Sequence, residues 1–275
     1  MIDAEGIIYA GQFSKYNEEG PKPTALGTVH RVSDAGICER QRWYKAAEFD
    51  ESEAPDMGTL LAFHVGNSIH DFVQEAFVRQ SVVGGVSVDV EVPVDCRGLG
   101  VDLSGSADLV VTYADGHKVV VEFKSASAYG SKLAQDGPKR EHVAQVGLYA
   151  RGLGADAVTI VYVAKETSYR DKVRAGDVYQ HSYGLDMEVF PGESVNDVVN
   201  FELHRFRRVQ NALDDGVVPV PIVFDDSDGS RELSRLKTVD VPGPYGRAKK
   251  GSHWECRYCF FNSLCHSIGP DKVKL

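Results

Sequence analysis

Residues 105–124 read GSADLVVTYADGHKVVVEFK, and this stretch decides the fold that we expect. Two apolar runs rich in valine flank the tripeptide Ala114-Asp115-Gly116, as in two strands joined by a tight turn. A three-residue loop that ends in glycine favours a type I turn closed by a left-handed residue. This loop places Tyr113 opposite His117 and, counting back along both strands, Asp108 opposite Glu122.

The register of this hairpin decides whether the two carboxylates can meet. Directly opposed residues share one face of the sheet, with their Cβ atoms about 4.5–5.5 Å apart. A two-residue Asp-Gly loop would shift the pairing by one residue and put Asp108 and Glu122 on opposite faces. We therefore predict the three-residue loop, because only this loop brings the carboxylates together.

Asp108, Glu122 and Lys124 form a candidate site for phosphodiester hydrolysis. Hard ions such as Mg²⁺ or Mn²⁺ prefer oxygen ligands, and they can activate a water and relieve the charge of a phosphate. Lys124 is two residues after Glu122, so it shares the same strand face and can orient the water. The alternative is an ordinary hairpin whose exposed face carries charge, although Val119, Val120 and Val121 place Glu122 at the end of a buried strand.

Hydrophobic periodicity predicts the elements around this hairpin. Residues 1–32 are rich in glycine and polar residues and indicate an irregular arm, and Ser33-Asp34 is expected to begin a helix that carries Cys38. The other expected elements are helices at about 57–80, 138–153 and 194–213 and strands at about 86–94, 106–113, 118–124, 157–164 and 178–187. This order predicts an α/β fold, a mixed sheet flanked by helices, with residues 33–215 as its core. Residues 216–275 are expected to form a connection and a small cysteine module.

Composition limits the class of protein. The net charge of −10 argues against a protein that coats nucleic acid non-specifically, but it is compatible with an enzyme that binds one strand in a local basic groove. No apolar run is long enough to cross a membrane and no signal peptide is expected, so we expect a cytoplasmic location. No GxxxxGK[ST] motif occurs, so the chain has no helicase motor of its own.

Five cysteines in such a protein do not indicate a disulfide framework. Cys256, Cys259 and Cys265 crowd together near the C-terminus, which indicates a metal centre, and Cys38 is the candidate fourth ligand. Four thiolates suit a [4Fe–4S] cluster or a tetrahedral zinc ion. The alternatives are a local zinc site with His253 or His266 as fourth ligand, or three packed thiols.

The order of motifs resembles that of the RecB-like branch of the PD-(D/E)xK nucleases, which have a restriction-endonuclease-like core. Its pattern is a helical histidine, GxxD, ExK and QxxxY, and the matching residues are His70, Gly105 to Asp108, Glu122 to Lys124, and Gln145 to Tyr149. The resemblance implies an Mg²⁺ or Mn²⁺ site on His70, Asp108, Glu122 and the carbonyl of Phe123. It also implies that Lys124 is the catalytic lysine and that Gln145 and Tyr149 assist it. His64, on the same helix, is a rival for the role of His70.

One group within this branch resembles the chain over about residues 33–266, because it places one cysteine before the nuclease core and three after it. This group includes the fourth CRISPR-associated (Cas) protein and AddB-type nuclease domains. The resemblance implies a structural [4Fe–4S] cluster on Cys38, Cys256, Cys259 and Cys265, whereas Cys96 has no place in the pattern.

These inferences predict an exonuclease that degrades single-stranded DNA from an end. Protein partners from a recombination or CRISPR-adaptation system are compatible with the resemblance, and the polarity, the pathway and the oligomeric state stay open. Two basic stretches are candidates for guiding the strand, Arg205 to Arg208 and Arg247 to Lys250, with a solvated helix face as the alternative for the first. The competing functions are a non-catalytic DNA-binding or redox-sensing module and a zinc-stabilised endonuclease.

Overall fold

The computed structural model describes residues 3–20, 24, 26–223, 231–232, 256, 258–269 and 273–274. The largest sheet has six strands in the order β1-β3-β4-β5-β6, and the remaining strand, β2, pairs with β3. Their bounds are β1 His30–Arg31, β2 Ser87–Asp95, β3 Leu103–Thr112, β4 Lys118–Ala126, β5 Ala157–Ala164 and β6 Val178–Gly184. The sheet is mixed, because β1 pairs with β3 and β4 with β5 in parallel, while the other pairs are antiparallel.

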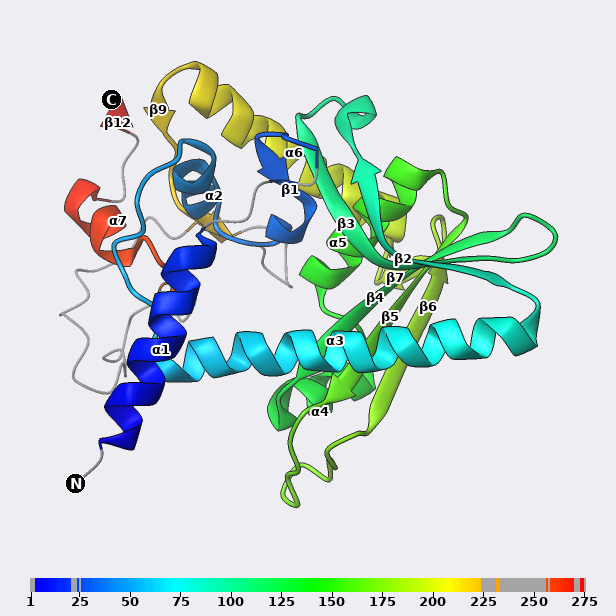
Figure 1. Ribbon diagram of the computed structural model, residues 1–275. Coiled ribbons are helices and arrows are strands. Elements are labelled where there is room, and N and C mark those ends of the chain that lie inside the picture. Colours follow the sequence, from blue (N-terminus) through cyan, green and yellow to red (C-terminus); the bar gives the residue numbers. More distant parts are fainter. Residues whose placement is uncertain are drawn as a thin grey trace.

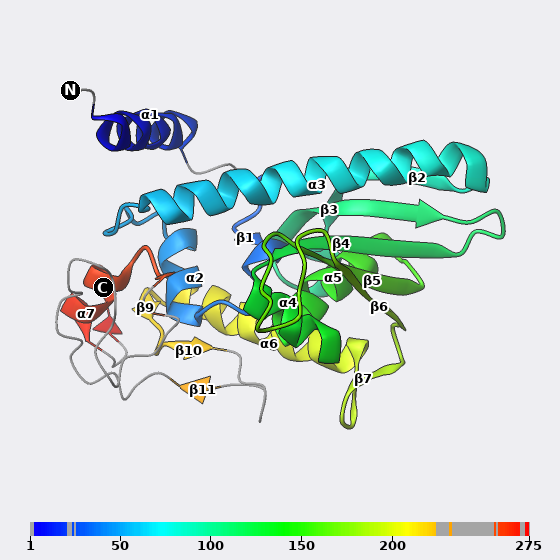
Figure 2. The same ribbon diagram turned by 90° about the horizontal axis from the view of Figure 1, so that it is seen from below.

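Helices cover both faces of the sheet (Figures 1 and 2). Helix α3 (Met57–Gly84) packs its Val73 and Phe77 on one face, against a cluster that contains Phe123. Helices α5 (Arg140–Leu153) and α6 (Val195–Asp214) cover the other face, where the main core lies. Alternate strand residues therefore enter different cores, as the pleat of a strand requires.

A second core joins both ends of the chain. Helix α2 (Glu39–Ala46) contributes Trp43 and Tyr44, the end of α6 contributes Val209, and the segment before helix α7 (Asn262–Ile268) contributes Phe261. The side chain of Tyr44 lies against that of Phe261, with ring centroids 5.3 Å apart. The C-terminal cysteine segment is thus packed on α2.

Shorter elements complete the described fold. They are α1 Ala4–Glu19, α4 Ala128–Asp136, the 3-10 turns Val32–Asp34 and Arg97–Leu99, and the strand pairs β7 Glu188–Phe190 with β8 Glu193–Ser194, β9 Val217–Val218 with β12 Val273–Lys274, and β10 Ile222–Val223 with β11 Arg231–Glu232. None of the described helices is both long enough and apolar enough to span a membrane.

The mixed α/β fold predicted from the sequence is confirmed, and two local predictions are wrong. The expected irregular arm contains helix α1, which begins where the Asp3 side chain accepts a hydrogen bond from the Gly6 amide (3.0 Å). The next helix begins at Glu39, with Cys38 at its N-cap, and not near Ser33-Asp34. Asp34 ends a 3-10 turn instead, and its carboxylate binds Lys45 at 2.6 Å.

Gly105 allows helix α5 to approach the sheet closely. A Cβ atom built on Gly105 would lie 2.6 Å from Cε1 of Tyr149 and 3.1 Å from Cβ of Val32. These distances are shorter than van der Waals contact. The glycine of GxxD and the tyrosine of QxxxY are therefore partners in packing.

Gly105→Ala should destabilise the protein by about 1–3 kcal/mol, because the added methyl group overpacks this contact. Chemical denaturation monitored by circular dichroism would measure the loss. Gly98→Ala is the matched control, since a Cβ there meets nothing within 4 Å. Equal stability of the two variants would contradict the packing argument.

Candidate functional site

Strand β3 changes its pairing partner next to Asp108. Ser104 pairs with Arg31 of β1 on one edge and with Asp95 of β2 on the other. The pairing with β4 begins only at Leu109, on the edge that β1 has left. Residues 105–108 therefore lie in a gap between β1 and β4, and the gap is where the candidate site forms.

The predicted register of the hairpin is confirmed. Val110 pairs with Val120 and Thr112 with Lys118, which is the register that the three-residue loop predicts. Tyr113 donates its amide to the carbonyl of His117 (2.9 Å) at the turn. If the same register continues for one residue beyond Leu109, Asp108 lies opposite Glu122.

Side chains satisfy the backbone groups near Asp108 that lack strand partners, on the β4 side and on the β2 side of β3. The Asp108 carboxylate (Oδ2) accepts the amide of Phe123 at 2.7 Å, where a strand carbonyl would otherwise accept. The carbonyl of Asp108 accepts from the Gln74 side chain at 3.1 Å, and the same amide group donates to Glu91 at 2.8 Å. Glu91 itself has a positive φ of 48°. Sequence reasoning missed Gln74 and Glu91, which belong to none of the expected motifs.

Glu122, Lys124 and Gln145 form a closed ring of hydrogen bonds. The ammonium of Lys124 donates to Oε1 of Glu122 (2.8 Å) and to Oε1 of Gln145 (2.8 Å). Gln145 donates its amide to the same Glu122 oxygen at 2.7 Å. Its amide nitrogen also lies 3.5 Å from the hydroxyl of Tyr149, one turn later on α5. The structure thus brings together the residues of ExK and QxxxY.

One oxygen of the site is left for a further ligand. Oε2 of Glu122 is buried and has no hydrogen-bond partner in the described part of the chain. A buried carboxylate oxygen without a partner is costly, so a cation at this point would be stabilising. Asp108 is likewise buried, and Nδ1 of His70 lies 3.6 Å from its Oδ2. His64 lies on the exposed side of α3, away from this pair.

The donor set fits a hard divalent ion. It contains two carboxylates and one imidazole. Sites of this composition bind Mg²⁺ or Mn²⁺ chiefly through their carboxylate oxygens. In the described residues, no three histidine, cysteine, aspartate or glutamate side chains are close enough to form a ready-made site. The orphaned Glu122 oxygen is the observation that supports an ion between Glu122 and Asp108.

Burial raises the pKa of both carboxylic acids. The pKa of Asp108 rises to about 6 and that of Glu122 to about 7, because burial disfavours their charged forms. Lys124 opposes both shifts by stabilising the carboxylates. Burial also lowers the pKa of His70, so this imidazole is neutral and able to bind a cation at neutral pH.

Four cysteines of the described chain line one pocket between α2 and α7, although no three of them come close enough together to form a ready-made metal site. Its lining includes Cys38, Cys256, Cys259, Cys265 and His266. Burial raises the pKa of Cys38 and raises that of Cys259 to about 12, so these two thiols hold their protons unless a cation is bound. Cys96 lies elsewhere, buried in the main core, as expected of a cysteine outside the pattern.

Arg40 places a buried positive charge against this pocket. Its guanidinium donates to the carbonyl oxygens of Pro219 (2.6 Å) and Gly269 and lies 3.9 Å from Sγ of Cys265. The side chain is fully buried. It connects α2 with two segments of the C-terminal region, and its charge suits an anionic tetrathiolate centre.

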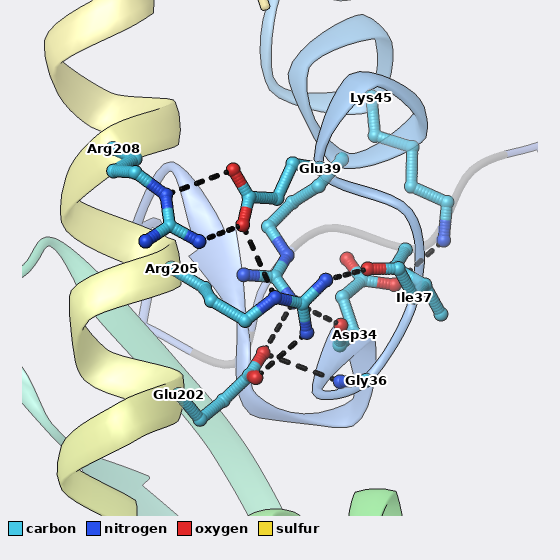
Figure 3. A network of polar contacts seen from close by, with 9 residues as sticks. Asp34, Gly36, Ile37, Glu39, Lys45, Glu202, Arg205 and Arg208 are labelled. Carbon is cyan, nitrogen blue, oxygen red and sulfur yellow. Dashed lines mark hydrogen bonds and ion pairs between the residues drawn. The ribbon is translucent and has the colours of Figure 1, made fainter. Parts of the chain in front are cut away.

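Part of the first basic stretch is turned into the protein and not toward solvent. Figure 3 shows that Arg205 and Arg208 point from α6 toward α2, where both bind the Glu39 carboxylate. Arg205 is fully buried and also binds Glu202 at 2.8 Å, while Arg207 donates to the carbonyl of Leu99. The expected role in guiding DNA is therefore wrong for Arg205, because its charge is compensated inside the protein. The second stretch, Arg247 to Lys250, and His253 lie outside the described residues.

The same network extends to the start of α2. Glu202 binds Arg42 and accepts the Gly36 amide at 3.2 Å, and Arg205 donates to the carbonyl of Ile37 at 2.7 Å. These bonds hold the residues on both sides of Cys38 against α6. The burial of Glu202 and Arg205 could have been predicted from the sequence of α6, because both residues fall on its apolar stripe with Val198 and Val209.

Comparison with known proteins identifies the family. The profile of the PD-(D/E)XK nuclease superfamily matches residues 28–266. No curated protein matches the chain. Among solved structures, SSO0001 aligns with a TM-score of 0.47 and 13% identity over 95% of each chain. The alkaline exonuclease LHK-Exo of Laribacter hongkongensis aligns with a TM-score of 0.45 and 12% identity over 69% of this chain and 90% of its own. LHK-Exo in complex with dAMP gives the same TM-score with 13% identity, over 69% and 89%.

The raised carboxyl pKa values predict how stability depends on pH without divalent ions. The unfolded chain releases these protons near pH 4, whereas the folded site holds them until about pH 6–7. The stabilisation is therefore complete below about pH 4 and is lost as the pH rises to about 7. Asp108→Asn should melt at a higher temperature than the wild type at pH 8 and show a flatter dependence on pH.

Differential scanning calorimetry without divalent ions would measure this dependence. Asp136→Asn, at the exposed end of α4, is the control for the change of charge. An Asp108→Asn protein that melts below the wild type at pH 8 would contradict the argument.

Proposed function

The chain belongs to the PD-(D/E)XK nuclease superfamily, and on this premise we propose that it is a divalent-metal-dependent exonuclease that degrades single-stranded DNA from an end. The observation that supports the chemistry is the unpartnered oxygen of Glu122 beside Asp108 and the ring of bonds that holds Lys124. A structural [4Fe–4S] cluster on Cys38, Cys256, Cys259 and Cys265 is the second part of the proposal.

Asp108 and Glu122 would hold an Mg²⁺ or Mn²⁺ ion, with His70 and the carbonyl of Phe123 as further ligands. Such an ion, once bound, lowers the pKa of a water molecule and relieves the charge of the phosphate. The amide of Phe123 fixes the Asp108 carboxylate, so its free oxygen has a defined direction. Asp108, Glu122 and Phe123 form a rigid donor set because they lie on the adjacent strands β3 and β4, and His70 approaches them from helix α3.

Lys124 is placed to orient the attacking water. An ammonium group has three donors, and two of them are used on Glu122 and Gln145. The third is available for the water or for a phosphate oxygen. Gln145 acts as a positioning residue, because it accepts from Lys124 while donating to Glu122, which fixes both side chains. Burial raises the pKa of Tyr149 well above its ordinary value, so its hydroxyl stays neutral.

The four thiolates would hold the cluster between the two ends of the chain. Cys38 lies at the N-cap of α2 and Cys265 within α7, and Arg40 contacts the sulfur of Cys265. Metal–thiolate bonding would offset the entropy of closing so long a loop. One observation favours the zinc alternative: Nε2 of His266 is buried at this pocket without a hydrogen-bond partner among the described residues.

The catalytic proposal predicts that Asp108→Asn and Glu122→Gln abolish Mg²⁺- or Mn²⁺-dependent degradation of end-labelled single-stranded DNA. Lys124→Gln should lower the rate about 10²–10³-fold, because a positioned electrostatic group is lost. His70→Ala should have a milder effect, since water can replace one ligand. Circular DNA should resist the wild-type enzyme if an end is required.

The matched control for charge is Asp95→Asn, which removes an exposed carboxylate paired with Arg97. Its rate should equal that of the wild type. An Asp108→Asn protein that retains full activity after contaminating nucleases are excluded would rule out this site.

The cluster proposal predicts iron and labile sulfide in protein purified without air, about four of each per chain. Cys38→Ser should lose the metal, whereas Cys96→Ala and His266→Ala should keep it. Elemental analysis and absorption spectra would measure the content. Stoichiometric zinc that survives Cys38→Ser but is lost in His266→Ala would establish the local zinc site instead.

A further inference from the structure

The connection between β5 and β6 carries an aromatic side chain on an exposed turn. Residues 165–177 project beyond the ends of both strands (Figure 1), and a bridge between Ser168 and Val173 closes the turn. Tyr169, at its tip, is 95% exposed. A single exposed aromatic side chain is common on protein surfaces, so its surroundings decide whether it belongs to a binding surface.

The connection carries four cations and three acids, a net charge of +1. Its three acids are occupied, since Glu166 accepts the Ala128 amide (2.7 Å), Asp171 binds Ser168 and Lys132, and Asp177 accepts the Arg174 amide (2.7 Å). Its four cations are Lys165, Arg170, Lys172 and Arg174, and within the described part of the chain none of their side chains forms an ion pair. In a protein with a net charge of −10, these cations form a local site for anions.

An apolar groove adjoins this turn on the α3 side of the sheet. Val65, Ser68, Ile69 and Phe72 of α3 form one wall, and the end of β5 with Lys165 and Gly176 forms the other. Phe72 is 73% exposed. Lys165 belongs both to the groove and to the basic turn, so the two surfaces are continuous.

The groove begins beside the proposed catalytic residues. Ala126 of β4 pairs with Ala164 in its wall, and Ala126 is two residues after Lys124. His70 lies on α3 between Ile69 and Phe72, so the metal site and the groove share this helix. Glu122 and Lys124 extend from β4 toward α5, whereas the groove lies on the α3 face at the same end of the sheet, so a bound strand would pass from one to the other beside His70.

We propose that this groove and the basic turn together bind the single strand next to the cleaved phosphate. Unpaired bases lie against Phe72 and the apolar walls, Tyr169 stacks on a further base, and the cations of the turn contact phosphates. The ligand is an unpaired nucleic-acid strand because apolar walls accept the face of a base, whereas a duplex presents only its phosphates and base edges. The direction of the path rests on the proposed nuclease site.

The charge part of the proposal is tested by fluorescence anisotropy with a labelled short oligothymidylate, in the Asp108→Asn background that prevents turnover. Arg170→Glu with Lys172→Glu should weaken binding. The slope of log K against log salt concentration should become shallower by about 1.4, which is about 0.7 for each of two phosphates that are no longer neutralised. Lys15→Glu with Arg79→Glu is the control with the same change of net charge, on exposed helix positions away from the groove. Equal effects of the two pairs would overturn the proposal.

The aromatic part has its own readout. Tyr169→Ala and Phe72→Ala should each weaken binding of the oligothymidylate roughly tenfold, with little change in salt dependence, because stacking is removed while the charge is unchanged. Tyr113→Ala, at the β3–β4 turn on the opposite end of the sheet, should bind normally. Unchanged affinity in both variants would contradict the proposed binding path for the strand. A blunt duplex whose binding is weakened by Phe72→Ala as much as that of the single strand would also contradict it.

Wild-type degradation of the same oligothymidylate, measured in parallel, separates this proposal from the nuclease assignment. Binding that requires Tyr169 and Phe72 in a protein that cleaves nothing would support the path and contradict the catalytic proposal. Cleavage that is insensitive to the variants of the groove and the turn would support the catalytic proposal and contradict the proposed binding path.

Discussion

The change of pairing partner along one edge of strand β3 is the constraint on which the candidate site depends. Because β1 and β4 share one edge of β3, a gap of a few residues must separate them, and backbone groups in that gap lose their strand partners. Asp108 stands at its end and satisfies the amide of Phe123 with its carboxylate. The same group thus completes the fold and faces the position proposed for a cation. Buried backbone groups are costly when unpaired, so the carboxylate is held there by the sheet itself.

The hairpin that positions Glu122 could be predicted from the sequence because its determinants are local. A turn of known length ending in Gly116, whose φ is 87°, fixes the register of all residues on both strands. The long helices and the buried strands also followed from periodicity alone. The roles of His70, Gln145 and Tyr149 came from a resemblance and not from any physical signal in those residues.

The remaining features depend on tertiary contacts that no local pattern encodes. Arg205 was expected on a DNA-binding surface because clustered cations usually face solvent, yet it is buried by partners far away in the sequence. Its partner Glu39 is 166 residues distant, so neither helix alone shows the pairing. The hydrogen bonds of the acids around Tyr169 were missed for the same reason, whereas helix α1 begins at a local cap, Asp3, that the sequence does contain.

The charge network between α2 and α6 also sets an order for assembly during synthesis. Glu39 emerges early, and until α6 has been made this carboxylate has no guanidinium to compensate its burial, so α2 cannot dock. The sheet from β2 to β6 is complete before that point, whereas Cys38 waits for residues from the far end of the chain. Because Cys256, Cys259 and Cys265 follow every strand of the large sheet in the sequence, the cysteine pocket can close only after the residues of that sheet have been synthesised.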